Sequence, residues 1–379
     1  MNVDYEILRC LSWGILWLIV IIFSLSGGYN LGVSILFPFL AKTDEERQTL
    51  LKSLGVTWNG HQLWFITIGL VLFTAWPMVY MVLFSGMYAI LSLACLALFI
   101  RPFIVYYRNK LLSEKKRFYC DKALFLTGFI PIFALGIAIG NLLKGVPFHL
   151  DSDMRIIYYG DFWSLLNPFT FLTMITTLGI FMLYGAVYIQ LKTDGEMAGR
   201  AKEKVQLGAI ITVIGFVLTG LWVMRLEGYH IESETLFNGV SNPLAKFVKR
   251  GEGLWMDNYE HIPALAVIPI MALISCGLTV GLSIQNKLKL AFISSGVTLV
   301  FMIVTMALSM FPFMLPSNMS LNSSLSLWDA SSSYKTLSIT FWVTLLFLPV
   351  AVIYTRWVSK LLRLNLKQDL SKVSSQPLL

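Results

Sequence analysis

The stretch LSWGILWLIVIIFSLSGGYNLGVSILFPFL, residues 11–40, contains no acidic, basic or histidine side chain. A helix of about 20 predominantly apolar residues suffices to cross the roughly 30 Å of hydrocarbon in a bilayer. The stretch therefore predicts a membrane-spanning helix. Within it, the segment SLSGGYNLG, residues 24–32, is polar and rich in glycine, which is unusual for a surface that faces lipid.

The rest of the chain repeats this pattern. It is 56% hydrophobic and 13% charged, with a mean hydropathy of +0.71, whereas an ordinary soluble domain is about 25% charged. These values predict an all-α integral membrane protein. Residues 1–358 are expected to form a single membrane domain, and the largely polar residues 359–379 a short cytoplasmic tail. Nine membrane-spanning helices are expected, approximately at residues 11–40, 60–76, 78–100, 123–143, 164–189, 205–223, 263–284, 290–315 and 336–358.

The charged residues predict the orientation of the chain. The longest loop, residues 226–262, holds six carboxylates and is expected outside the cell, with the N-terminus. The C-terminus is then cytoplasmic, because positively charged loops stay on the cytoplasmic side. This pattern accounts for the net charge of +8, so no nucleic-acid partner is expected. The basic residues that define the cytoplasmic side are Arg108, Lys110, Lys115, Lys116, Arg117, Lys122, Lys192, Arg200, Lys202, Lys204, Lys287, Lys289, Arg356, Lys360, Arg363 and Lys367.

Several chemistries are disfavoured by where the reactive side chains fall. All 21 carboxylates lie in tails, in loops or at span boundaries. A secondary transporter coupled to protons normally keeps ionisable groups at membrane depth, so that class is a weaker alternative. His61 begins the second span, whereas His149, His230 and His261 lie in loops, which leaves no obvious ligand set for a haem. The four cysteines show no metal-binding spacing, and we expect no metal site.

Two places hold polar side chains at or near membrane depth. The stretch VTWNGHQLWF, residues 56–65, opens the second span. It suits either an interfacial aromatic belt with an amide cap, or a contact for a quinone head group or a file of water. Asn30 belongs to the polar patch of the first span. The candidate residues for a polar path or quinone contact are Asn30, Trp58, Asn59, His61, Gln62 and Trp64.

Arg101 is a further polar candidate, outside these two places. It precedes Pro102 and lies two turns before Arg108, which places it roughly 10 Å deeper in the membrane on a continuous helix. One interpretation is that its long side chain extends to a lipid phosphate. The other is that it pairs with an anion from another chain or a cofactor, because no carboxylate lies within the predicted spans.

An ordered set of motifs along nearly the whole chain resembles subunit II of the cytochrome bd-type quinol oxidases. The motifs are VDYEILR, SGGYNLGV, WNGHQLW, AWPMVY, FSGMY, FIRPF, GNLLKGVPF, NPF, SNPL, FPFMLPSN and LSLWDASSS. The resemblance implies two four-helix bundles, at residues 11–143 and 164–315, and a ninth helix.

The resemblance also implies a membrane complex and its chemistry. A partner, subunit I, would carry haems b and d, and this chain would ligate none. The complex would oxidise quinol, reduce O₂ to water and contribute to the proton motive force in the bacterial cytoplasmic membrane. Lipid and small accessory membrane subunits are further expected partners. A scaffolding subunit with no site of its own remains the alternative.

This chain departs from the family pattern at its acidic positions. The family usually has Asp-Gly-Phe-Asp-x-Gly and Trp-Asp-Gly-Asn where this chain has GGYNLG and WNGH, and Tyr106 replaces a further acid. Gly27, Asn30 and Asn59 thus stand where the family has acids associated with proton delivery. An amide cannot exchange a proton near neutral pH. We therefore expect the proton path to lie mainly in subunit I.

The polar patch has two interpretations. Residues 24–32 either form the inward face of the first helix, packed against the second with a polar strip, or make a packing seam of small residues with no functional water.

Overall fold

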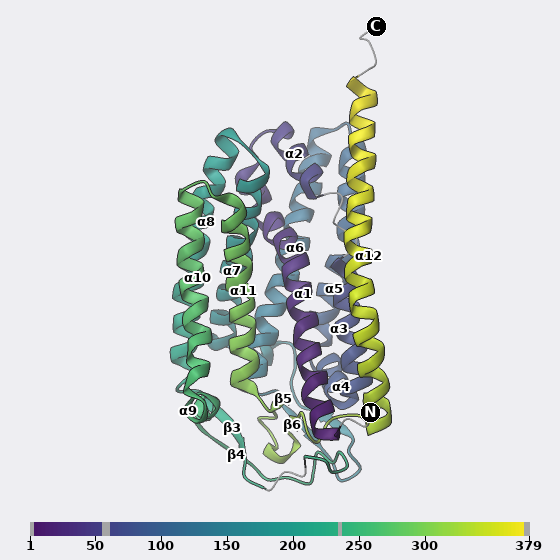
Figure 1. Ribbon diagram of the computed structural model, residues 1–379, viewed down its shortest axis with the longest axis vertical. Coiled ribbons are helices and arrows are strands. Elements are labelled where there is room, and N and C mark those ends of the chain that lie inside the picture. The colour runs from purple at the N-terminus through teal and green to yellow at the C-terminus, as the bar shows by residue number, and fades with distance from the viewer. Residues whose placement is uncertain (1–3, 55–60, 234–236, 375–379) are drawn as a thin grey trace.

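The computed structural model describes the backbone of residues 4–54, 61–233 and 237–374, and their side chains except at positions 53–54, 61–62, 109 and 355–374. Long helices run side by side along one axis, and short β-hairpins gather at one end (Figure 1). We call this the hairpin end, and the opposite end, where helix α2 (Asp44–Leu54) lies, the α2 end. Helix α1 (Tyr5–Leu40) begins at the hairpin end, and α12 (Tyr334–Ser374) ends beyond the α2 end (Figure 1). This is the arrangement that an odd number of crossings requires.

Eight helices of the described chain are long and apolar enough to cross a bilayer, which confirms an all-α protein that crosses the membrane several times. The second predicted span corresponds to α3 (His61–Ala75), whose 15 described residues extend only about 22 Å. The count of nine spans therefore stays a prediction. The eight helices are α1 (Tyr5–Leu40), α5 (Tyr88–Lys110), α6 (Glu114–Lys144), α7 (Pro168–Lys192), α8 (Gly195–Val223), α10 (Val267–Ile284), α11 (Leu288–Met310) and α12 (Tyr334–Ser374).

The predicted third span, residues 78–100, is wrong in its bounds. The chain forms α4 (Pro77–Gly86), breaks at Met87 and continues as α5 to Lys110. The break coincides with a tertiary contact, because a side chain at Gly86 would overlap the ring of Tyr158. At the other end of the chain, α12 runs past residue 358 to Ser374, so most of the predicted tail continues the last helix.

The helices pack as two groups that share α1. One group contains α1, α3, α5 and α6, the other contains α7, α8, α10 and α11, and α12 packs on α1 and α3. The half of α1 near the hairpin end, with Leu16 and Phe23, belongs to the core of the first group. Its other half, with Leu31 and Phe37, belongs to the core of the second. The first helix therefore joins the two bundles.

Gly28 and Gly32 of the polar patch face α7. A Cβ atom at Gly28 would lie 2.8 Å from the ring of Phe181, and one at Gly32 would lie 2.9 Å from the backbone of Gly185. The expectation that this face packs against the second predicted span is thus wrong for these two glycines. Small residues allow backbones to approach closely, and here they let α1 cross α7 almost backbone to backbone.

Three two-stranded antiparallel sheets cap the hairpin end. Tyr229, Trp255 and Phe313 form a small core beneath these sheets, and the indole of Trp255 donates a hydrogen bond to the carbonyl of Leu143 at 2.9 Å. This cap holds the ends of the membrane helices together. The strands are β1 (Phe148–Leu150) with β2 (Ile156–Tyr158), β3 (Glu227–Ile231) with β4 (Val248–Glu252), and β5 (Phe313–Leu315) with β6 (Leu325–Ser326). The short helix α9 (Asp257–His261) and 3₁₀ turns complete the loops.

Ion pairs fasten α2 to the opposite end of the bundle. Arg108, near the end of α5, lies 2.5 Å from a carboxylate oxygen of Asp121 on α6 and 2.8 Å from one of Asp44 on α2. Arg117 also pairs with Asp44, at 2.7 Å. Glu46 pairs with Arg200 of α8. Through these pairs α2 contacts both helix groups.

Candidate functional site

A buried polar cluster joins α1 to α5 in the membrane part of the first group. The Arg101 side chain is 4% exposed, and its Nη2 donates to the backbone carbonyl of Asn30 and to the hydroxyl of Ser34. The Ser34 hydroxyl donates in turn to the Asn30 carbonyl at 3.1 Å. The guanidinium thus contacts oxygens of its own chain and is not extended to the membrane surface.

The side chain of Asn30 is the other unusual feature of the cluster. It is 3% exposed, and within the described part of the chain neither its Oδ1 nor its Nδ2 has a hydrogen-bond partner. Burying an amide without such a partner costs about 1–3 kcal/mol. By contrast, the hydroxyls of Ser24 and Ser26 donate to carbonyls of their own helix. Asn30 is therefore the residue of the patch whose polar side chain is left unsatisfied.

The structure describes only some of the remaining predicted residues. Trp58 and Asn59 lie outside the described residues. His61 is the first residue of α3, but its side chain and that of Gln62 also fall outside the description. Trp64 is 2% exposed and lies in the hydrophobic core of the first group. The structure therefore brings together Asn30 and Arg101, and sets Trp64 apart in the apolar core.

An aromatic cluster beside the polar patch was not predicted from the sequence. Tyr29 of α1 stacks on Tyr188 of α7 at a centroid distance of 4.4 Å, and Tyr184 stacks on Phe292 of α11 at 4.9 Å. The Tyr184 hydroxyl donates to the carbonyl of Leu25 at 3.1 Å. The spacing of Tyr184 and Tyr188, four residues apart on one helix, was the signal available in the sequence.

The described histidines lie at the hairpin end and are engaged there. His230 contacts Asp257 at 2.9 Å, His261 contacts the carbonyl of Asp257 at 2.8 Å, and His149 approaches Ser323 at 3.4 Å. Among the described residues, no group of three histidine, cysteine or acidic side chains could hold a metal ion. Each of these three imidazoles therefore already contacts a group of its own chain.

With this geometry in view, the similarity to known proteins decides the family. A model described as cytochrome bd terminal oxidase subunit II matches residues 8–362. The chain belongs to this family. It is a subunit II of a cytochrome bd oxidase, and hence one subunit of an oxidoreductase complex in the bacterial inner membrane.

Relatives from several bacteria agree with this assignment. The chain is 39% identical over 356 residues to cytochrome bd-I ubiquinol oxidase subunit 2 of Escherichia coli (strain K12), and 94% of each chain is covered. It is 38% identical to the probable cytochrome oxidase subunit 2 of Haemophilus influenzae over 355 residues, again with 94% of each covered.

A solved structure supports the fold of this subunit II. A chain in the structure of bd oxidase from Geobacillus thermodenitrificans superimposes with a TM-score of 0.66, covering 92% of this chain and 98% of that one. Its sequence identity is 15%, so this likeness concerns the fold. Membership of the cytochrome bd oxidases implies a haem-containing complex with a subunit I as partner.

Proposed function

We propose that this subunit II is the non-haem-ligating subunit of an enzyme that oxidises quinol and reduces O₂ to water, with haems b and d held by subunit I. The observation that carries the proposal is the match over residues 8–362, together with 39% identity to a named ubiquinol oxidase subunit. The position of the described histidines at the hairpin end supports the assignment of the haems to the partner.

Proton delivery, in this proposal, runs mainly through subunit I. Asn30 stands where the family usually has an acid, and its amide cannot take up and release a proton near neutral pH. Arg101 is bonded to α1 and holds α5 in place. The cluster of Asn30, Ser34 and Arg101 is then a structural element that keeps the shape of the polar strip without its titratable groups.

The interfacial stretch is proposed as the place where quinone would touch this subunit. Its candidate contacts are Trp58, Asn59, His61, Gln62 and Trp64, which combine flat rings with hydrogen-bonding groups. Contact with subunit I near Arg101, accessory membrane subunits and bound lipid belong to the same proposal. Arg101 itself is buried in this chain, so it would act on a partner through the helices that it fastens.

The test compares membranes that contain subunit I with and without this chain. We expect quinol-dependent O₂ consumption, and the absorption bands of haems b and d, only when both subunits are present. Full oxidase activity from subunit I alone would contradict the proposal. Solute uptake into vesicles that contain this chain alone would favour a transporter instead. A scaffold would be favoured if variants at every candidate contact still incorporate haem stably and oxidise quinol with unchanged kinetics.

A further inference from the structure

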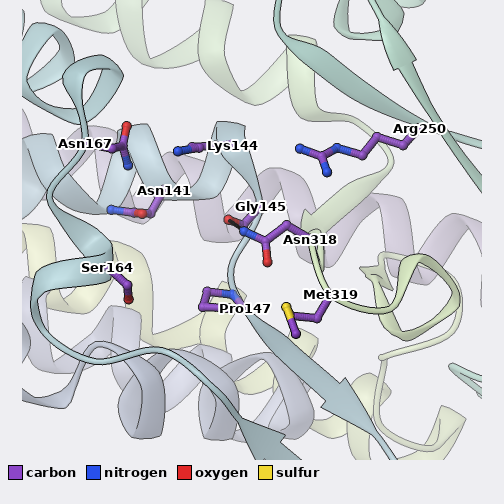
Figure 2. A pocket seen from close by; sticks show the side chains of 9 residues that line it. All are labelled: Asn141, Lys144, Gly145, Pro147, Ser164, Asn167, Arg250, Asn318 and Met319. Carbon is purple, nitrogen blue, oxygen red and sulfur yellow. Dashed lines mark hydrogen bonds between the residues drawn. The ribbon is translucent and has the colours of Figure 1, made fainter.

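A pocket of about 360 Å³ lies at the hairpin end, where α6 ends and α7 begins (Figure 2). It is distinct from the cluster around Asn30 and Arg101. Three sequence motifs that carried the family resemblance meet there, namely GNLLKGVPF, NPF and FPFMLPSN. The lining residues are Asn141, Lys144, Gly145, Pro147, Ser164, Asn167, Arg250, Asn318 and Met319.

Two cations line this pocket, and neither is fully compensated. Within the described residues, the ammonium of Lys144 forms no ion pair or hydrogen bond. Arg250, on β4, pairs through Nη2 with Glu227 at 2.8 Å, but its Nε is buried and has no partner in the described structure. Figure 2 shows the guanidinium extending from its strand toward Lys144 and Gly145. No carboxylate is among the lining residues, so the pocket carries excess positive charge.

A further unsatisfied donor lies at the start of α7. The Oδ1 of Asn167 accepts a hydrogen bond from the amide of Thr170 at 3.1 Å, which caps the helix. Its Nδ2 is buried and has no partner among the described residues. The ammonium of Lys144 lies on the same side of the pocket as this amide (Figure 2). The N-terminus of a helix also favours a negative charge, because its first amide groups and the helix dipole point toward it.

Three backbone carbonyls next to these donors already accept hydrogen bonds. At the end of α6, the carbonyl of Leu143 accepts from Trp255, that of Lys144 from Tyr229, and that of Gly145 from Asn318. The lining also contains the side-chain oxygens of Asn141, Ser164 and Asn318, but its two charged groups, Lys144 and Arg250, are both donors. Such an arrangement suits a ligand that has only acceptors and carries negative charge.

We propose that this pocket binds a phosphate group, held by Lys144, Arg250 and the amide of Asn167. A phosphate offers several acceptor oxygens in a tetrahedral arrangement, which matches donors that approach from different elements. The pocket also lies where α6 ends and α7 begins, and both helices are long and apolar enough to cross a membrane. The phosphate therefore belongs either to a phospholipid or to free inorganic phosphate. This inference does not depend on the proposed electron-transfer function.

Phosphate binding is tested on the purified two-subunit complex after removal of lipid. Inorganic phosphate is titrated by calorimetry against sodium chloride of equal ionic strength. We expect saturable binding to the wild-type complex and a loss of about tenfold or more in affinity for Lys144→Gln and Arg250→Gln, since each removes a charge-assisted contact. Lys144→Arg should retain binding. Lys249→Gln is the matched control, because Lys249 neighbours Arg250 but is 63% exposed and lies outside the pocket.

A second measurement distinguishes the two sources of phosphate. Native mass spectrometry counts phospholipids retained by the complex before lipid is removed. If the head group is the ligand, Lys144→Gln loses one phospholipid relative to Lys249→Gln, and the lipid-containing wild type no longer takes up inorganic phosphate. If free phosphate is the ligand, Lys144→Gln and Lys249→Gln retain the same number of phospholipids. The wild type then binds inorganic phosphate both before and after lipid is removed. Absence of saturable phosphate binding and of a retained lipid in the wild type overturns the proposal, even if the variants fail to assemble.

Discussion

At the scale of single residues, the guanidinium of Arg101 is a buried charge in the membrane part of the described chain. Its hydrogen bonds to the Asn30 carbonyl and to Ser34 compensate part of the cost of burying its charge. The side chain thereby links α5 to α1. A buried charge of this kind acts on the stability of the complex.

Truncation of Arg101 should therefore destabilise the complex. We expect Arg101→Ala to lower the free energy of unfolding by about 2 kcal/mol, because hydrogen bonds to a charged group are worth about 1.5–3 kcal/mol and part of the desolvation cost is relieved. The midpoint of thermal unfolding of the purified complex is the measurement. The exposed Arg225, at the end of α8, provides the control Arg225→Ala, which should leave the midpoint unchanged. Equal midpoints for wild type and Arg101→Ala would show that these bonds contribute nothing.

Replacement of Asn30 tests whether the polar patch conducts protons. Because neither amide atom has a partner in the described chain, Asn30→Leu removes an unsatisfied polar group and should leave stability unchanged or raise it by about 1 kcal/mol. The rate of quinol oxidation should fall by less than about threefold, a change in barrier below roughly 0.7 kcal/mol. O₂ consumption per haem is the measurement. A tenfold loss in the rate of quinol oxidation with haem content intact would show that the patch takes part in proton delivery.

At the scale of elements, the crossing of α1 and α7 depends on two glycines. Gly32→Ala would place a methyl group against the backbone of Gly185 and Phe181, which cannot move aside as a flexible side chain can. Overpacking of this kind costs about 1–3 kcal/mol. We expect a matching loss in the unfolding free energy of the complex.

Gly14 provides a matched control on the same helix. A side chain there meets nothing within 4 Å, so Gly14→Ala should be neutral or mildly stabilising, as alanine favours helix over glycine. If both variants lose the same stability, the close crossing is not what makes Gly32 sensitive.

The docking of α2 should depend on pH. Burial alone would raise the pKa values of Asp44 and Glu46, but it is outweighed for Asp44 by the guanidinium of Arg108 and for Glu46 by the Lys42 amide and Arg200, so both pKa values are lowered. Carboxylates with lowered pKa values stabilise the folded state above their unfolded values, about 3.9 for Asp and 4.3 for Glu. That stability is lost as pH falls from there through the folded values.

Thermal unfolding midpoints measured from pH 7 to pH 3 check this expectation. At pH values below about 4, the midpoint temperature should fall, because the unfolded-state pKa values of the two carboxylates lie near there. Glu46→Gln should show a shallower fall, because one of the titrating groups is gone. Glu45→Gln, at an exposed neighbouring position, should follow the wild type. A Glu46→Gln profile that overlays that of the wild type would contradict a role for this ion pair.

Hydropathy alone was enough to predict the long membrane helices, because burial in lipid imposes the same requirement on each of them. It could not predict the break at Met87, which coincides with a contact between Gly86 and the distant Tyr158. Helix α2 was missed although its signal was present. Thr43 and Glu46 cap it reciprocally, and that spacing is a recognised start signal.

The candidate site was predictable only in part. Asn30 and Arg101 could be singled out because each is polar in an apolar helix. That Arg101 bonds to the backbone of Asn30 depends on how α1 and α5 cross, which no local pattern encodes. The pocket proposed to bind phosphate could not be predicted for the same reason. Its donors come from α6, the start of α7 and β4, and they meet only in the folded chain.

At the scale of the whole molecule, the three histidines whose side chains are described, His149, His230 and His261, lie in the cap. We therefore expect this chain, expressed alone, to bind no stoichiometric haem, whereas the complex with subunit I should show b- and d-type absorption bands. Pyridine haemochrome analysis of both preparations is the measurement. A haem spectrum from the isolated chain would show that the partner does not hold all the haem.

The shared first helix also has a consequence for biosynthesis. Gly32 emerges from the ribosome about 150 residues before Gly185, the residue that it must meet. At roughly 5–20 residues per second, α1 waits about 8 to 30 s in the membrane with its glycine face open. A nascent chain stalled before residue 168 should therefore expose this face to other proteins of the insertion machinery, and one stalled only after α7 has left the ribosome and inserted beside α1 should not.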